Sequence, residues 1–223
     1  LYLHGFVLYI SLKSYILKHQ ENQQNQENKE NKEKTKPIII IETGTAKGFS
    51  SIIMAKTLKE LNQDGTIHTI DIIPPNKPLI RNTINDLNKY PKTLYEILEP
   101  HPYKELYQKY IKFHHGDSKD IIPEITKNIP NSRVNFAFLD AHHTYTNLTN
   151  ELNLILPYQN PEDMIICDDY TIYLKQQNQQ IYQYPGIIKA LKEFVVKNHN
   201  YTNHIYYGND GDKLRGYVVL QKK

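Results

Sequence analysis

The sequence predicts an α/β fold: a Rossmann-like, doubly wound sheet of about seven strands, mostly parallel. Short apolar runs without polar alternation recur along the chain, which is typical of strands buried on both faces of a parallel sheet. Amphipathic stretches at helical spacing separate most of these runs. The last two strands, over 204–207 and 216–221, have a turn sequence but no helix between them. We expect them to form an antiparallel hairpin that closes the sheet.

The first 36 residues precede this pattern and fall into two parts. Residues 1–19 are apolar, but Lys13 interrupts them before the roughly 20 apolar residues that a bilayer-spanning helix needs. We expect an amphipathic helix that docks on the domain, with membrane-surface contact or the remnant of a signal or anchor as alternatives. Residues 20–36 are polar and low in complexity, which predicts a flexible linker or a solvated helix extension.

The folded domain is expected over 37–223, where strands and helices alternate. A first strand, a glycine loop, a helix and a second strand form one βαβ unit. The Pro- and Tyr-rich stretch 74–112 gives weaker signals. The expected strands cover 38–41, 66–72, 111–114, 134–139 and 164–167, before the hairpin, and the expected helices cover 50–61, 103–111, 120–128, 146–156 and 185–196.

Composition narrows the class of protein. A chain of 223 residues suits one domain with a substantial core. The net charge of +3 does not call for nucleic acid as a partner. With one cysteine, Cys167, no internal disulfide can form, and the chain fits a reducing, cytoplasmic compartment. Cys167 lies inside an apolar strand and is interpreted as a core thiol rather than a nucleophile.

Acidic residues stand at the ends of the predicted strands. In open α/β sheets ligands bind beyond the carboxyl ends of the strands. A single acid there has an ordinary explanation, because strands often lead into polar loops. Five strand ends in phase instead predict a ligand site, and the acids concerned are Glu42, Asp71, Asp117, Asp140, and Asp168 with Asp169.

The loop after the first strand reads Glu-Thr-Gly-Thr-Ala-Lys-Gly over residues 42–48. Gly44 and Gly48 allow a sharp turn and a close approach of the backbone to a ligand. The dinucleotide pattern G-x-G-x-x-G is absent because Ala46 stands at its second glycine, and Lys47 precedes Gly48 in the wrong order for a phosphate loop. An acid before the loop suits a ligand with a cationic or hydrogen-donating end.

The stretch E-T-G-T-A-K-G-F-S resembles motif I of class I S-adenosylmethionine (SAM)-dependent methyltransferases, and the order of features is similar over 37–223. That family has a seven-stranded sheet with an antiparallel last strand. LDAHHTYTNLTNEL and IICDDY resemble the branch of catechol, caffeoyl-CoA and sugar O-methyltransferases. The resemblance implies transfer of a methyl group from SAM to a hydroxyl of a small molecule, with a sugar or a phenol as the acceptor.

The resemblance also assigns cofactor roles by position. The first loop would line the methionine and ribose of SAM, and Ser50 would lie near its carboxylate. Asp71 would accept hydrogen bonds from the ribose hydroxyls, and Asp117, beside Ser118, would contact the adenine amino group; carboxylates suit these donors because they only accept. The full set is Glu42, Gly44, Thr45, Gly48, Ser50, Asp71, Asp117 and Ser118.

Asp140, Asp168 and Asp169 are the candidate metal ligands. Three carboxylates at adjacent strand ends would repel one another unless a positive charge lay between them. Oxygen ligands suit a hard divalent ion, above all Mg²⁺, and in the similar O-methyltransferases such an ion binds the acceptor hydroxyl and lowers its pKa. Part of that branch has an amide as third ligand. The alternative is that Asp169 caps a loop and no metal binds.

Asp140, His142 and His143 are the candidate catalytic residues. A neutral imidazole can take the proton from an acceptor hydroxyl, and in related enzymes a base stands two or three residues after this aspartate. We favour His143 slightly as the base. In the alternatives, His142 is either the base or a metal ligand. A structural turn histidine remains the other interpretation of each. The acceptor would be bound by the N-terminal segment and the Tyr-rich stretches 74–110 and 171–186.

Other functions remain open. A nicotinamide-dependent oxidoreductase would share the sheet and the ribose-binding acid, but not the loop sequence or the hairpin. A non-catalytic binding module would retain the cofactor pocket for structure or partner recruitment, without catalysing a reaction. A nucleic-acid methyltransferase is disfavoured, because Asp140-Ala141-His142-His143 stands where the Asn/Asp-Pro-Pro-aromatic tetrad belongs and the sequence has no concentrated basic stretch.

Overall fold

The computed structural model describes residues 2–26, 36–78, 92–129, 133–174, 180–210 and 213–223. Its helices are α1 (Tyr2–Gln26), α2 (Phe49–Glu60), α3 (Leu94–Leu98), α4 (Tyr103–Tyr110), α5 (Ser118–Asn128), α6 (Tyr145–Ile155), the 3₁₀ turn η2 (Leu156–Tyr158) and α7 (Pro185–Lys197). Its strands are β1 (Ile38–Thr43), β2 (Gly65–Asp71), β3 (Ile111–His115), β4 (Phe136–Leu139), β5 (Met164–Cys167), β6 (Ile172–Leu174), β7 (Gln180–Tyr182), β8 (Tyr201–Asp210) and β9 (Lys213–Lys222).

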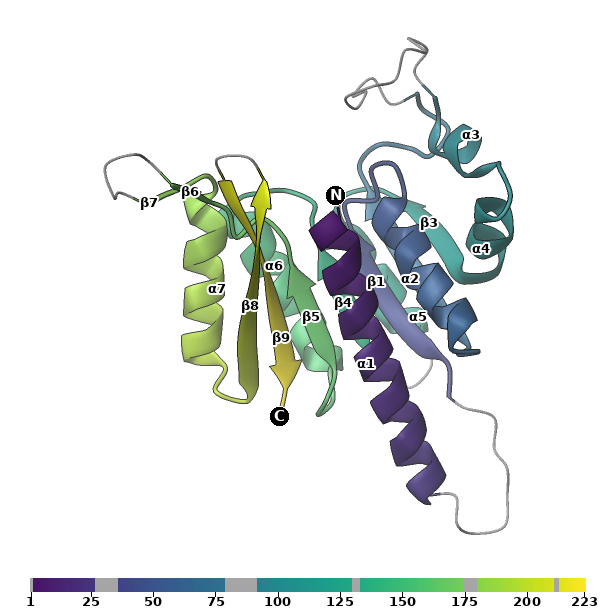
Figure 1. Cartoon of the computed structure of the whole chain (residues 1–223), viewed down its shortest axis with the longest axis horizontal. Coiled ribbons are helices and arrows are strands. Elements are labelled where there is room, and N and C mark those ends of the chain that lie inside the picture. The colour runs from purple at the N-terminus through teal and green to yellow at the C-terminus, as the bar shows by residue number, and fades with distance from the viewer. Residues whose placement is uncertain (1, 27–35, 79–91, 130–132, 175–179, 211–212) are drawn as a thin grey trace.

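These strands form one sheet with helices on both faces (Figure 1). The order β3-β2-β1-β4-β5 is parallel throughout, and β9 pairs antiparallel with β5. Because β8 is antiparallel to β9, it runs in the direction of β5, and β9 is reversed relative to both. The predicted fold class and the closing hairpin are therefore confirmed. The short β6–β7 hairpin, which extends the sheet at β9, lies in a stretch where we had expected a loop.

Successive side chains of a strand point to opposite faces of the sheet, where they contribute to two separate hydrophobic cores. Ile39 and Ile41 of β1 point to the layer formed by α5, α6 and α7, whereas Ile38 and Ile40 point to α1, α2, α3 and α4. All four side chains are buried. This explains the run of four isoleucines: a central parallel strand covered on both faces has no solvent side and needs no polar alternation.

Helix α1 packs along the face of the sheet (Figure 1). Leu8, Leu12 and Ile16 recur at intervals of four residues and are fully buried, so docking on the domain is the role that α1 has here. The helix continues to Gln26, so the first part of the predicted linker is a helix extension, and residues 27–35 lie outside the described part. Among the described residues, no helix is long and apolar enough to cross a membrane.

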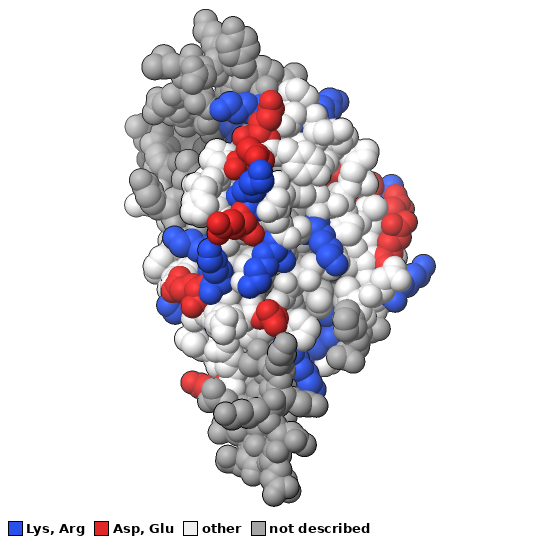
Figure 2. Space-filling view, turned by 90° about the vertical axis from the view of Figure 1, so that its right-hand side faces the viewer, with Lys and Arg blue, Asp and Glu red and all other residues white. Residues whose placement is uncertain are grey.

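Charged side chains of both signs alternate on the face drawn in Figure 2, which shows no area of a single sign. On α2 and α4, for example, Lys59 pairs with Glu105, and near by Lys104 pairs with Glu99. A face of this kind offers no continuous track for a phosphate backbone.

Candidate functional site

The loops after β1 and β4 touch at the carboxyl edge of the sheet. Gly44 has φ +86°, and a Cβ at this position would lie 2.2 Å from the backbone oxygen of Asp140. Glycine is therefore required both for the backbone conformation and for the close contact. Gly48, with φ +74°, leads into α2. The predicted glycine loop thus has the shape expected of it and lies directly against the candidate catalytic strand end.

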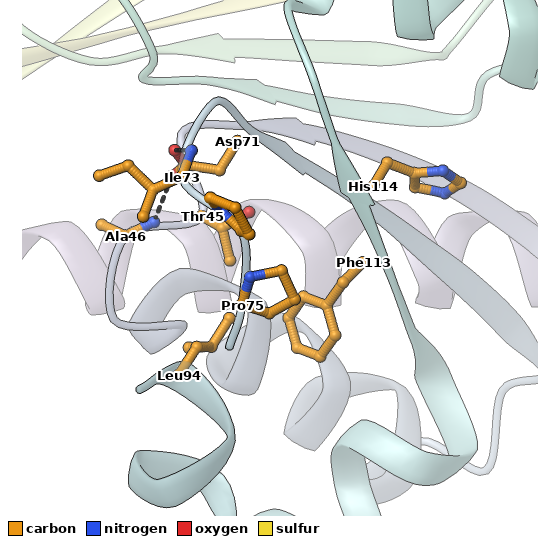
Figure 3. A pocket seen from close by; sticks show the side chains of 9 residues that line it. Thr45, Ala46, Asp71, Ile73, Pro75, Leu94, Phe113 and His114 are labelled. Atoms are coloured by element: carbon orange, nitrogen blue, oxygen red, sulfur yellow. Dashed lines mark hydrogen bonds between the residues drawn. The ribbon is translucent and has the colours of Figure 1, made fainter. Parts of the chain in front are cut away.

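A pocket opens between this loop and the end of β2 (Figure 3). It is shallow and open to solvent, and its lining residues are Thr45, Ala46, Asp71, Ile73, Pro74, Pro75, Leu94, Phe113 and His114. The Asp71 carboxylate accepts the backbone N–H of Ala46 at 2.9 Å and that of Ile73 at 2.8 Å. A carboxylate has about four acceptor positions, so Asp71 can still accept hydrogen bonds from a ligand. Apolar walls beside a fixed carboxylate fit a nucleoside.

Glu42 and Ser50 are already engaged with each other. Glu42 is fully buried, and its two carboxylate oxygens accept the hydroxyls of Ser50 and Ser51 in the first turn of α2. Burial raises the pKa of Glu42, although the two hydroxyls oppose that shift. The carboxylate therefore anchors the N-terminus of α2, and contact of Glu42 and Ser50 with a cofactor stays a prediction.

Asp117 is the N-cap of α5, and Ser118 is the first residue of that helix; neither lines the pocket described above. Asp117 accepts the backbone N–H of Lys119 at 3.1 Å, and this bond and the Lys119 ammonium lower the pKa of Asp117. The hydroxyl of Thr43 donates at 3.3 Å to Glu151, a buried acid of α6 that the sequence reasoning missed. Burial raises the pKa of Glu151 to about 7. A glutamate among Leu148, Leu152 and Ile155 on the apolar face of a helix was the signal that could have revealed it.

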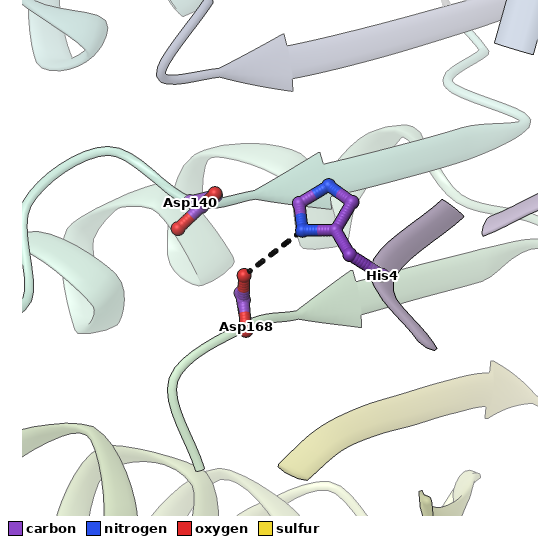
Figure 4. Close-up of side chains that lie close together, drawn as sticks. All are labelled: His4, Asp140 and Asp168. Atoms are coloured by element: carbon purple, nitrogen blue, oxygen red, sulfur yellow. Dashed lines mark ion pairs between the residues drawn. The ribbon is translucent and has the colours of Figure 1, made fainter. Parts of the chain in front are cut away.

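Asp168 follows β5 and lies close to Asp140 and His4 (Figure 4). It is 2% exposed and accepts Arg215 Nη2 at 2.6 Å and Arg215 Nε at 3.3 Å. The backbone N–H of Asp169 adds a third bond at 2.6 Å, and His4 Nδ1 of α1 lies 3.4 Å from Oδ2. Burial alone would raise the pKa of Asp168, but the bonds from His4 and Arg215 outweigh burial and lower it.

Asp140 differs from Asp168 in its hydrogen-bond partners. Within the part of the chain that the structure describes, its side chain has no hydrogen-bond donor. Burial and the charges of Asp168 and Asp169 raise its pKa well above the usual range, and Arg215 offsets this only in part. A carboxylate without a donor is one that a bound hydroxyl could reach.

His143, not His142, reaches the acidic cluster. Its Nδ1 pairs with Asp169 Oδ2, its ring lies 4.6 Å from that of Tyr184, and the bond to Asp169 raises the pKa of His143. His142 is exposed and close enough to Asp117 to influence its pKa. The geometry thus favours His143 over His142 at the reacting centre.

The predicted all-carboxylate metal site does not fit this arrangement. Among the described residues no three carboxylates gather within 4.8 Å; instead two mixed groups share Asp140, one with His4 and Asp168 and one with His143 and Asp169. Mg²⁺ takes oxygen ligands, and the Asp168 oxygens already bind donors of the chain itself. The guanidinium of Arg215, 3.9 Å from Asp169 as well, supplies the positive charge that the sequence reasoning had assigned to an ion.

A family model described as a methyltransferase domain matches residues 41–170, more than half of the chain. The chain belongs to this methyltransferase family. The resemblance to class I SAM-dependent methyltransferases is thereby confirmed, and with it the expectation of an enzyme. The matched segment runs from β1 to the residue after Asp169, so it contains both the glycine loop and the acidic cluster of the methyltransferase domain.

Solved structures show the same fold at low sequence identity. An O-methyltransferase from Bacillus cereus, in complex with S-adenosylhomocysteine (SAH), is 16% identical with a TM-score of 0.58; the match covers 96% of this chain and 90% of that one. TomG from Streptomyces achromogenes, an O-methyltransferase of tomaymycin synthesis in complex with SAM, is 14% identical with a TM-score of 0.60 and coverages of 98% and 79%. CalS11, a TDP-rhamnose 3′-O-methyltransferase of calicheamicin biosynthesis, is 15% identical with a TM-score of 0.51 and coverages of 82% and 71%. A search of curated proteins finds no match.

Proposed function

We propose that this methyltransferase domain moves the methyl group of SAM to a hydroxyl of a small molecule or sugar. One observation carries the proposal: the pocket beside Thr45 and Asp71 and the unpaired carboxylate of Asp140 flank the same loop. Gly44 of this loop donates its backbone N–H to Ile70 in β2 and packs against the backbone of Asp140 after β4. A nucleoside in the pocket would bring its sulfonium toward Asp140. That SAM is the cofactor is supported by the SAM and SAH complexes of two proteins with this fold.

The reaction needs alignment and a proton acceptor. The acceptor oxygen forms a bond to the methyl carbon in line with the sulfur, and the carbon–sulfur bond breaks with its electron pair left on sulfur, which yields SAH. The hydroxyl proton passes to Asp140 or to His143, which Asp169 and Tyr184 hold in place. His142 has no part in this scheme.

Metal assistance stays a prediction that the geometry does not favour. A bound Mg²⁺ would act as a Lewis acid on the acceptor hydroxyl, but binding it at Asp168 would require Arg215 to withdraw. The acceptor class is supported by the sugar and tomaymycin pathways of CalS11 and TomG. We propose residues 37–223 as the catalytic unit, working in the cytoplasm with α1 docked on it; contact of the N-terminal segment with a membrane is the alternative.

Calorimetry with SAH and with NAD tests the cofactor. We expect the full chain to bind SAH and not NAD, and Asp71→Ala to weaken SAH by about tenfold or more, because lost hydrogen bonds to a charged group are each worth roughly 1.5–3 kcal/mol. Lys47→Ala, in the same loop at a position to which we assign no contact with the cofactor, is the control. Binding of NAD without SAH would instead support the oxidoreductase.

Turnover separates the enzyme from a non-catalytic module. Labelled SAM is offered with sugars, catechols and cell extract, with and without Mg²⁺. We expect methyl transfer by the wild type and its loss in Asp140→Ala while SAH affinity is kept. Tight SAH binding without transfer to any acceptor, or unchanged transfer by Asp140→Ala, would contradict the catalytic role of this site.

A further inference from the structure

The carboxylate of Asp168 is saturated by donors from this chain. Its oxygens receive two N–H groups of Arg215 and the backbone N–H of Asp169, and the imidazole of His4 approaches from the other side. A carboxylate offers about four acceptor positions. No lone pair of Asp168 is left for an ion, unless one of these contacts breaks.

Both long-range donors reach Asp168 from elements that pack on β5. Arg215 comes from the reversed strand β9, which pairs with β5, and His4 comes from the first turn of α1. The His4 ring is held edge-on by Phe49, Phe138 and Tyr217, so its place does not depend on Asp168 alone. In Figure 4 the His4 ring lies between the two strand ends and faces both Asp140 and Asp168.

Asp163, at the other end of β5, has the same kinds of partner as Asp168: one arginine and one side chain of α1. Asp163, directly before β5, is buried and accepts Arg133 Nη2 at 2.7 Å and Arg133 Nε at 3.0 Å. It too accepts a bond from α1, here from the Tyr15 hydroxyl at 2.9 Å. Asp163 lies at the amino end of the strand, away from the ligand edge, so this arrangement serves to hold α1 on the sheet.

We propose that Arg215 is the resident cation of the acidic cluster, and that Asp168 is a latch for α1 and β9 rather than a metal ligand. The inference rests on the proposed function, whose site it describes. It makes Asp140 the one member of the predicted metal triad that stays open to an acceptor, and it makes the domain independent of a divalent ion. Arg215 is then a positioning residue: it touches Asp168 and Asp169, not the reacting atoms.

Mn²⁺ is the probe for this proposal, because its binding to the full chain can be followed by electron paramagnetic resonance without turnover. We expect the wild type, stripped with a chelator, to bind SAH normally and to show no saturable Mn²⁺ site. Removing the guanidinium in Arg215→Gln should expose the acids and raise Mn²⁺ affinity by at least about tenfold. Asp140→Asn added to Arg215→Gln should abolish that gain.

Arg133→Gln is the matched control, since it frees a buried aspartate that has no second carboxylate beside it, and it should gain no Mn²⁺ site. One Mn²⁺ per wild-type chain, released by Asp140→Asn or Asp168→Asn, overturns the proposal. So does a folded Arg215→Gln chain that gains no Mn²⁺ site. If Arg215→Gln does not fold, the wild-type titration decides alone. Failure of the wild type to bind SAH would count against the proposed function and not against the latch.

Discussion

Strand β5 has a buried aspartate at each end, and the two surroundings are built alike. Asp163 and Asp168 are 0% and 2% exposed, and each holds one arginine and one side chain of α1. The two contacts on α1, His4 and Tyr15, are about 16 Å apart along the helix at 1.5 Å per residue, which matches the roughly 16 Å that five strand residues span. Helix α1 therefore lies antiparallel to β5 and is held at its first turn and at its middle, beside the two ends of β5.

The two ends of β5 differ in the number of carboxylates that share one arginine. At the amino end, one carboxylate faces one guanidinium. At the carboxyl end, Asp140, Asp168 and Asp169 share Arg215. Burial, together with the charges of Asp168 and Asp169, raises the pKa of Asp140. The comparison shows that each buried Asp–Arg pair ties elements of the fold together. The proposed reactive group, Asp140, is the acid of the cluster whose side chain has no hydrogen-bond donor among the described residues.

The largest expected effect comes from removing either arginine. Arg215→Met and Arg133→Met should each lower the free energy of unfolding by about 3–5 kcal/mol at neutral pH, because a buried carboxylate loses its counter-charge. The loss should be larger for Arg215→Met, where two further carboxylates repel Asp168. Urea denaturation followed by circular dichroism measures both.

The two variants should also differ in their response to pH. Without Arg215, the folded-state pKa values of the acid cluster rise, so stability should recover as the pH falls from 8 to 5 and protons bind the folded state. Arg133→Met should recover less, with one carboxylate to protonate. Equal losses with equal pH dependence would show that the two ends do not differ in charge as we infer.

Glu151 is a further buried acid, and among the described residues no arginine pairs with it. Burial raises its pKa from 4.5 to about 7. The folded state therefore holds a proton that the unfolded chain has lost, so stability should fall by about 3 kcal/mol as the pH rises from about 4.5 through 7. Glu151→Gln keeps the shape but cannot ionise, and it should remove this loss. A pH profile of Glu151→Gln parallel to that of the wild type would contradict the assignment.

The fold could be predicted from the sequence because its signals are local. Four isoleucines in β1, the glycines after it and the absence of a helix before β9 each specify their element without knowledge of the rest. Once the strands are taken as parallel, the acids that follow them are expected at the same edge of the sheet. The β6–β7 hairpin was missed because strands of only three residues are too short to show a hydrophobic periodicity.

The sequence indicated the acids, the glycine loop and His143, but not the residues that bind the acids. Arg215, His4 and Glu151 are distant in sequence from the motifs they join, and their roles follow from tertiary contacts of β9, α1 and α6. Arginine was nonetheless a usable signal: the chain has three arginines among 27 basic residues, and the two described above bind buried aspartates through the planar fork that lysine lacks.

At the amino end of β5, the α1 contact should be worth less than the arginine. The Tyr15 hydroxyl donates to Asp163 and accepts Asn135 Nδ2 at 2.8 Å, and both groups are buried. Tyr15→Phe leaves each of them one bond short and should cost about 1–3 kcal/mol of unfolding free energy. Tyr9→Phe on the same helix, whose hydroxyl binds the exposed Glu60, is the matched control and should cost less than about 1 kcal/mol.

The smallest effect is expected for the α1 contact at the carboxyl end. His4 reaches Asp168 at 3.4 Å, and its Nε2 is buried without a partner among the described residues, so the gain from this contact is partly cancelled. His4→Ala should cost about 1 kcal/mol, mostly from lost edge-on packing against Phe138 and Tyr217. Hydrogen exchange should rise in the first turn of α1 and stay unchanged around Tyr15, because the helix remains fastened there. Fast exchange along all of α1 in His4→Ala would mean that the carboxyl-end contact, and not the one at Asp163, holds the helix on the sheet.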